Sequence, residues 1–256
     1  MTAAKVELGR YLFYDKRMSG NGTQSCASCH VQKYAFADQK PRGEGSTGER
    51  HARGSMSLVN VAYAQTLTWI EQGLHSLEEQ ARVPMFGTHP IELGMDAKGE
   101  NFLAVMRADP VYKKLFGTNE ITIDNAIKAI ACFERSIVSA RAPYDRYHFD
   151  RDDTALSAAA KKGEELFFSQ PFACFRCHGG ANFTGRPEDE KGFKPPTLRN
   201  IVVTAPYMHD GSVATLEQAV GHQNPEMTAA QRASIVEFLR TLTDEAALND
   251  PKLGKP

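Results

Sequence analysis

The amino-acid sequence predicts an all-α protein made of two copies of one helical module. Three observations support this prediction: apolar residues recur with helical spacing, no convincing run of strand-like alternation is present, and the same motifs occur twice in the same order. A chain of 256 residues, 41% of them hydrophobic, is long enough for two small domains. We place these domains at residues 1–145 and 146–256.

The repeated motifs follow one order in both halves. In each half an aromatic-rich helical segment precedes a CxxCH motif, an S/T-L-E segment follows it, and an apolar helix closes the half. The paired segments are residues 9–14 and 163–168, residues 76–81 and 215–220, and residues 130–137 and 235–242. Such internal similarity indicates a duplicated structural unit.

Apolar spacing predicts an amphipathic helix over residues 123–137, with Thr122 or Asp124 as its N-cap and one polar break. Ser157 is expected to cap another helix, because it precedes a run of good helix formers. Two polar stretches rich in Gly and Pro are expected to be loops, at residues 39–54 and 179–196.

Four of the five cysteines belong to two CxxCH motifs. Two thiols three positions apart can form thioethers with both vinyl groups of one haem, and the adjacent histidine can then ligate the iron. Each half is therefore predicted to be a cytochrome c-like domain with one covalently bound haem c. The expected residues are Cys26, Cys29 and His30 in the first motif and Cys174, Cys177 and His178 in the second.

Two alternatives to haem explain the motifs less well. A four-cysteine zinc site or a redox dithiol would leave both trailing histidines without a role, and the pairs lie about 140 residues apart, far beyond the usual zinc spacing. The fifth cysteine, Cys132, falls on the apolar side of its helix and is expected to be a buried small hydrophobic residue.

Covalent attachment of haem c implies export, so we expect a periplasmic protein. The formal net charge of -1 and the pI near 6.7 do not indicate a nucleic-acid partner. No apolar run approaches the roughly 18–20 residues that span a bilayer, so we expect no membrane span.

The combined motifs resemble the bacterial di-haem cytochrome c peroxidase and MauG superfamily, and within it they are most like the MbnH-type di-haem enzymes of copper-acquisition operons. The segments that carry the resemblance are RGSMSLVNVAY, SLEEQARVPMFGTHPIELGM, CFRCHGG, PPTLRN and TAPYMHDGSVATLEQAV. The resemblance implies an oxidoreductase that uses hydrogen peroxide to oxidise a partner protein through a high-valent di-haem state. It points to a tryptophan side chain on a copper-binding periplasmic partner as the substrate.

The resemblance also implies roles for residues around the first motif. Glu92, in HPIELGM, matches a distal glutamate that moves a proton between the oxygens of peroxide during cleavage. Gln80 and Pro84 match other distal-pocket positions, and Trp69 matches a tryptophan placed between the two haems.

Further matches concern the second half. Thr204 and Pro206 match backbone ligands of a calcium ion between the haems, whereas Gly54 stands where the family has an asparagine ligand. His209 matches a structural histidine near the second haem, and Arg199 is expected to pair with a haem propionate.

At the first haem the sequence departs from the peroxidase pattern. Classical members carry a second histidine ligand about sixteen residues beyond the first motif, where this chain has Ser46. His51 lies nearby, but its spacing does not match. We therefore expect an open, five-coordinate haem at His30 that needs no reductive activation.

At the second haem the family's sixth ligand is Met or Tyr, but the matching position here is Gln223, preceded by His222. The chain is also short for the family after His222. Either the loop is naturally trimmed, or residues including the tyrosine are missing from the chain. We expect the latter, with a Cα separation at Gln223 far above 3.8 Å.

Two other functions stay open. The chain could be a peroxidase that reduces hydrogen peroxide with electrons from a small donor protein, which would gain support if His222 or Met227 ligated the second iron. It could also be an electron carrier without catalysis, which would require protein ligands on both faces of each iron.

Overall fold

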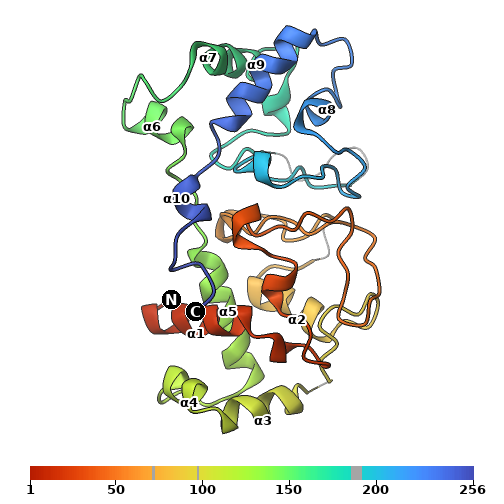
Figure 1. Ribbon diagram of the computed structural model, residues 1–256, viewed down its shortest axis with the longest axis vertical. Helices are drawn as coiled ribbons and strands as arrows, with labels where there is room; N and C mark the ends of the chain where they lie inside the picture. The colour runs from red at the N-terminus through yellow and green to blue at the C-terminus, as the bar shows by residue number, and fades with distance from the viewer. Residues whose placement is uncertain (71–72, 97, 186–191) are drawn as a thin grey trace.

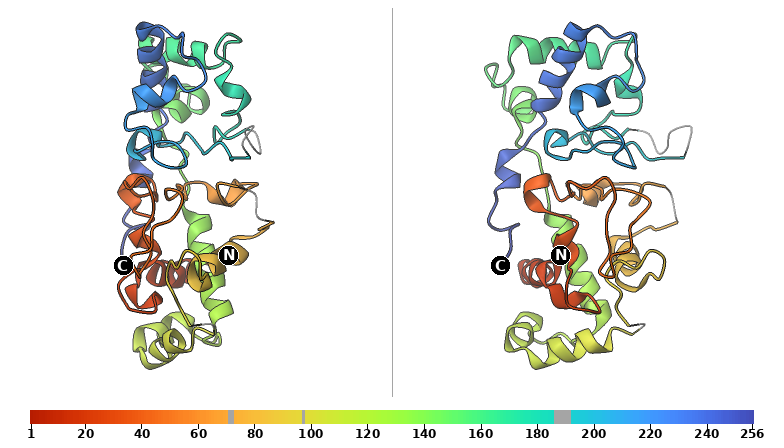
Figure 2. Two further views of the ribbon diagram at one scale, coloured as in Figure 1. Left: turned by 90° about the vertical axis from the view of Figure 1, so that its right-hand side faces the viewer. Right: turned by 45° about the vertical axis from the view of Figure 1, so that its right-hand side comes forward.

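The computed structural model describes residues 1–70, 73–96, 98–185 and 192–256. Its helices form two lobes stacked along the longest axis of the molecule, and α10 lies beside the junction (Figure 1; Figure 2). Within the described residues, the regular structure consists of α-helices and short 3-10 turns, together with isolated β-bridges. The predicted all-α fold is confirmed.

We call α1 to α5 with their connections the first lobe, and α6 to α9 the second lobe. The first lobe contains α1 (Ala3–Tyr14), α2 (Leu77–Phe86), α3 (Glu100–Ala108), α4 (Pro110–Phe116) and α5 (Ile123–Ser136). The second lobe contains α6 (Pro143–Phe149), α7 (Ala158–Phe167), α8 (Leu216–Val220) and α9 (Ala229–Arg240), and α10 covers Glu245–Leu248. The expected domain boundary at 145/146 falls within α6, and the division into domains stays a prediction.

Local capping explains where two of the central helices begin. The Thr122 hydroxyl accepts the backbone N–H of Asn125 at 3.2 Å and starts α5, one of the two caps predicted for this helix. The Ser157 hydroxyl accepts the backbone N–H of Ala160 at 3.1 Å and starts α7, as predicted. Cys132 is buried on α5, also as predicted.

In each lobe two helices cross at a glycine. α1 packs on α5, and α7 packs on α9. A Cβ atom on Gly9 would lie 1.9 Å from the Ala129 carbonyl oxygen, and one on Gly163 would lie 1.8 Å from that of Ser234. Because Cβ atoms do not approach backbone oxygens so closely, only glycine permits these crossings.

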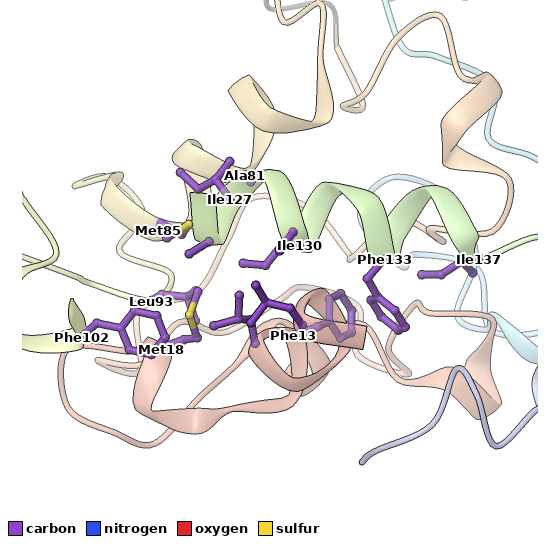
Figure 3. Close-up of a cluster of buried hydrophobic side chains, with 14 of the residues drawn as sticks. Phe13, Met18, Ala81, Met85, Leu93, Phe102, Ile127, Ile130, Phe133 and Ile137 are labelled. Carbon is purple, nitrogen blue, oxygen red and sulfur yellow. The ribbon is translucent and has the colours of Figure 1, made fainter. Parts of the chain in front are cut away.

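The core of the first lobe lies between α1 and α5, with α2 beside them (Figure 3). The ring centroids of Phe13 and Phe133 are 5.0 Å apart, and Phe36 lies 6.0 Å from Phe13. The second lobe repeats this trio with Phe167, Phe183 and Phe238, whose centroids are 5.2 to 6.0 Å apart. The two motif-bearing loops are therefore held on equivalent helix pairs.

The segment that follows α10 returns to the first lobe. Leu248 and Leu253 belong to its buried core, although they come after the whole second lobe in the chain. The Tyr14 hydroxyl donates to the Leu253 carbonyl at 2.8 Å, and the Arg10 guanidinium donates to the Gly254 carbonyl at 3.1 Å. No local pattern in the sequence predicts this contact, because its residues lie about 240 positions apart in the chain.

A buried ion pair lies at the start of the second lobe. Arg199 binds Asp145 through two hydrogen bonds of 2.9 Å, and both side chains are at least nine-tenths buried. The guanidinium also donates to the Ala181 carbonyl at 2.7 Å. The expected pairing of Arg199 with a haem propionate is wrong, because its fork already holds a carboxylate.

Candidate active site

The first CxxCH motif forms a 3-10 turn, Cys26–Ser28, which ends two residues before His30. His30 Nδ1 lies 2.8 Å from the Phe36 carbonyl oxygen, which places the ring proton on Nδ1 and leaves Nε2 available. Burial lowers the pKa of His30, so the imidazole stays neutral, as an iron ligand requires.

The second motif repeats this geometry at Cys174–Arg176. His178 Nδ1 lies 3.2 Å from the Phe183 carbonyl oxygen, and burial lowers the pKa of His178 to about 4. No disulfide joins the five cysteines, all of which lie in the described residues. The four motif cysteines line two different pockets, and among the described residues no three His, Cys, Asp or Glu side chains gather around one point. This separation excludes a shared four-cysteine zinc site and fits one haem in each pocket.

The first pocket, which contains His30, also contains the three predicted distal residues Gln80, Pro84 and Glu92. Gln80 and Pro84 are four positions apart on α2, so they lie on one face of that helix. Glu92 is fixed through its backbone, because its carbonyl accepts the Ser46 N–H at 2.7 Å. Residues expected from widely separated segments therefore face one pocket, although their roles stay predictions.

Burial raises the pKa of Glu92 to about 7. A carboxyl group with such a pKa can both accept and release a proton near neutral pH. Its side chain keeps 36% of its surface exposed, so a small molecule can reach it. This combination is typical of a general acid–base group.

Two further polar residues of the first pocket were missed as site residues by sequence reasoning. His51, set aside because of its spacing, lines the pocket with Nδ1 3.8 Å from Glu92 Oε1. Glu134 is the polar break expected in α5, and burial raises its pKa to about 8. Within the described residues, His51 Nε2 and Glu134 Oε2 are buried without a hydrogen-bond partner. For Glu134 the signal was present: a carboxylate on the apolar face of a helix.

The second pocket contains His178, Trp69 and His209. The Trp69 indole N–H donates to the Gly54 carbonyl at 2.8 Å, which ties the indole to the loop of the first lobe. The His209 ring stacks on Phe193 with centroids 4.1 Å apart. Trp69 thus connects a first-lobe loop with the second pocket, while an inter-haem role for it stays a prediction.

His222 and Gln223 also line the second pocket. The backbone is continuous here, since the Asn224 N–H donates to the Gly221 carbonyl at 3.2 Å across Gln223. The expected break at Gln223 is therefore wrong, because a tight turn closes the short loop. His222 Nδ1 lies 2.8 Å from the Ala219 carbonyl oxygen, the same anchoring that His30 and His178 have.

The expected calcium ligands lie next to a turn at the junction of the lobes. The Thr204 hydroxyl donates to the Ile201 carbonyl at 3.0 Å, and the Ala205–Pro206 peptide bond is cis. The Gly54 carbonyl, which stands in for the family asparagine, accepts the Trp69 indole. Calcium at Thr204 and Pro206 stays a prediction.

Within the part of the chain that the structure describes, no helix is both long and apolar enough to cross a membrane.

The chain is similar in sequence to a family model and to several known proteins. A family model described as di-haem cytochrome c peroxidase matches residues 3–154. The methylamine utilization protein MauG of Methylorubrum extorquens is 31% identical, over 99% of this chain and 82% of that protein. The cytochrome c551 peroxidase of Nitrosomonas europaea is 32% identical, over 95% of this chain and 81% of the peroxidase.

Among solved structures, the crystal structure of a MauG-like protein associated with microbial copper homeostasis has a TM-score of 0.91 with 33% identity. The superposition covers 100% of this chain and 94% of that one. The similarity therefore includes both lobes and both CxxCH motifs.

Proposed function

Because the chain belongs to the di-haem cytochrome c peroxidase family, a family of peroxide-dependent oxidoreductases, we propose that it uses hydrogen peroxide to oxidise a partner protein. The observation that carries this proposal is the first pocket, where Glu92 lies with Gln80 and Pro84 beside the histidine of a CxxCH motif. Two haem c groups follow from the family, one for each motif. When bound, they supply the redox centres that take two electrons from the substrate and give them to peroxide.

The protein's own part begins with peroxide binding in the first pocket. Ser46 stands where classical members have a second iron ligand, so no side chain at that position competes with peroxide. Cleavage of the O–O bond requires a proton on the leaving oxygen, which then departs as water. Glu92, with its pKa near 7, is the group we assign to deliver it.

Oxidation of a partner protein requires a route out of the pocket. Trp69 lines the second pocket and is held to the first-lobe loop by its indole N–H, so we assign it to electron transfer between the haems. Oxidation through such a route needs no substrate pocket. The MauG-like neighbour associated with microbial copper homeostasis supports a copper-binding partner. The oxidised group that we propose is a tryptophan side chain of that partner. Covalent haem attachment supports a periplasmic location.

One observation favours a second candidate, a peroxidase that takes electrons from a small donor protein. His222 is anchored through Nδ1 in the same way as the two motif histidines, and it lines the pocket of His178. A neutral imidazole on the second iron would raise its reduction potential compared with a tyrosinate. That would favour electron uptake from a donor.

Peroxide addition to the diferric holoprotein separates the two functions. We expect the optical and Mössbauer spectra of both haems to change without prior reduction, and the change to persist long enough for a partner protein to react. In Trp69→Phe the second haem should respond at least tenfold more slowly. A strict requirement for pre-reduction by a donor would contradict the proposal and support the peroxidase function.

A further inference from the structure

We propose that His51 is a second proton-transferring residue of the first pocket, which removes the first proton from hydrogen peroxide while Glu92 serves the leaving oxygen. This inference rests on the proposed use of peroxide in that pocket. It concerns a residue that the family motifs did not single out and whose spacing from the first CxxCH motif does not match that of the family's second iron ligand.

The backbone places His51 in the pocket. Residues 43–54 form a narrow loop in which the His51 N–H donates to the Gly43 carbonyl at 2.9 Å and the Gly43 N–H donates to the Arg53 carbonyl at 3.1 Å. An isolated β-bridge pairs Glu44 with Arg50 just beside it. The histidine ring therefore has a fixed attachment point and does not swing on a long unpaired segment.

The His51 ring is mostly buried, but packing alone does not explain why a histidine occupies this position. The side chain is 18% exposed, and within the described residues Nε2 is buried without a hydrogen-bond partner. Leaving such an atom unpaired costs about 1–3 kcal/mol, so most buried polar atoms in native proteins have a partner. Because Nε2 is enclosed by protein, a small polar ligand in the pocket meets the ring through Nδ1, the nitrogen nearer to Glu92.

The position of Glu92 defines what His51 can do. His51 Nδ1 and Glu92 Oε1 are 3.8 Å apart, too far for a direct hydrogen bond but close enough for both groups to contact one small molecule. Burial lowers the pKa of His51 and raises that of Glu92, which leaves a neutral imidazole as acceptor beside a carboxyl group that can donate.

The proposed step transfers two protons and breaks one O–O bond. His51 takes one proton from hydrogen peroxide and becomes imidazolium, and the peroxide becomes the hydroperoxide anion. Glu92 then gives its proton to the outer oxygen, which leaves as water when the O–O bond breaks. The bound haem would supply the two electrons that this cleavage requires. The proton on His51 returns to the Glu92 carboxylate through water in the pocket, which restores both residues.

Cyanide tests the proton acceptor without turnover. Hydrogen cyanide binds ferric haem as the anion and must lose its proton in the pocket, whereas imidazole binds as a neutral molecule. In stopped-flow measurements on the diferric holoprotein, His51→Leu should slow cyanide association by about 10²-fold, within the range of general base effects. Imidazole association should change little.

The exposed His89 provides a matched control, because His89→Leu removes a nearby imidazole outside the pocket. It should leave both rates unchanged. Should His51→Leu fail to fold, His51→Gln keeps a polar side chain without a useful proton acceptor and should show the same selective loss.

Three outcomes would overturn the assignment. Cyanide association could be unaffected, both ligands could slow equally, which indicates a structural role, or His51→Leu could convert a low-spin resting spectrum to high-spin, which indicates an iron ligand. A failure of the proposed function is distinguishable, since a requirement for pre-reduction would leave the cyanide result of the diferric protein intact.

Discussion

The two pockets share one frame but carry different chemistry. In each, a histidine is anchored through Nδ1 to a phenylalanine carbonyl and the supporting helices cross at a glycine. The first pocket adds two carboxyl groups with raised pKa values, Glu92 and Glu134, and the unpaired His51 Nε2. The described lining of the second pocket contains aromatic rings and no Asp or Glu.

This contrast shows how a duplicated unit can divide one reaction. Proton transfer needs titratable groups at the reacting oxygen atoms, whereas electron transfer does not. Both lobes have an anchored histidine and a helix crossing at a glycine, but the residues that line their pockets differ. Three predictions test this division of proton transfer and electron transfer between the two pockets.

The largest effect is expected from Glu92→Gln. Removal of the proton-donating carboxyl group should lower the rate of peroxide reduction by about 10²- to 10⁴-fold, because general acid catalysis contributes about that much. Stopped-flow absorbance of the diferric holoprotein with hydrogen peroxide measures the rate. Gln223→Glu, which adds a carboxyl group to the second pocket, is the counterpart and should not restore the rate. Restoration would show that the division between pockets is wrong.

The next effect concerns the shared frame. Gly9→Ala and Gly163→Ala should each lower the free energy of unfolding by roughly 1–3 kcal/mol, because the new methyl group meets a backbone carbonyl at the helix crossing. Urea titration followed by far-UV circular dichroism measures the loss. Each variant should disturb the absorption of the haem in its own lobe more than that of the other. Equal disturbance of both haems would mean that the lobes do not pack independently.

The third prediction is a pH dependence carried by Glu134 in the first lobe. The pKa of Glu134 is raised to about 8 in the folded protein, above its ordinary value of 4.5. The folded state therefore holds the proton more tightly, and the associated stability is present below pH 4.5 and is lost as pH rises towards 8. The slope is at most about 1.4 kcal/mol per pH unit.

Glu134→Gln removes this titration. Urea unfolding of both proteins at several pH values between 5 and 9 should show the wild-type stability falling relative to the variant as pH rises. Parallel curves would mean that Glu134 is not held protonated by burial.

Local signals in the sequence were sufficient for the fold class and for motif residues that the structure places in the two pockets. Thr122 and Ser157 were identified as caps because capping depends on a few adjacent residues. His51 was missed because its place in the pocket depends on the pairing of residues 43–54, which its distance from the CxxCH motif does not express. Arg199 was assigned to the wrong partner because the identity of a buried counter-ion, Asp145, is a tertiary property.

The return of the final segment to the first lobe has a consequence for how the protein matures. Leu248 and Leu253 belong to the first core, yet they leave the ribosome after the entire second lobe. The first lobe therefore lacks part of its packing until these residues dock and Tyr14 and Arg10 bind the carbonyls of Leu253 and Gly254.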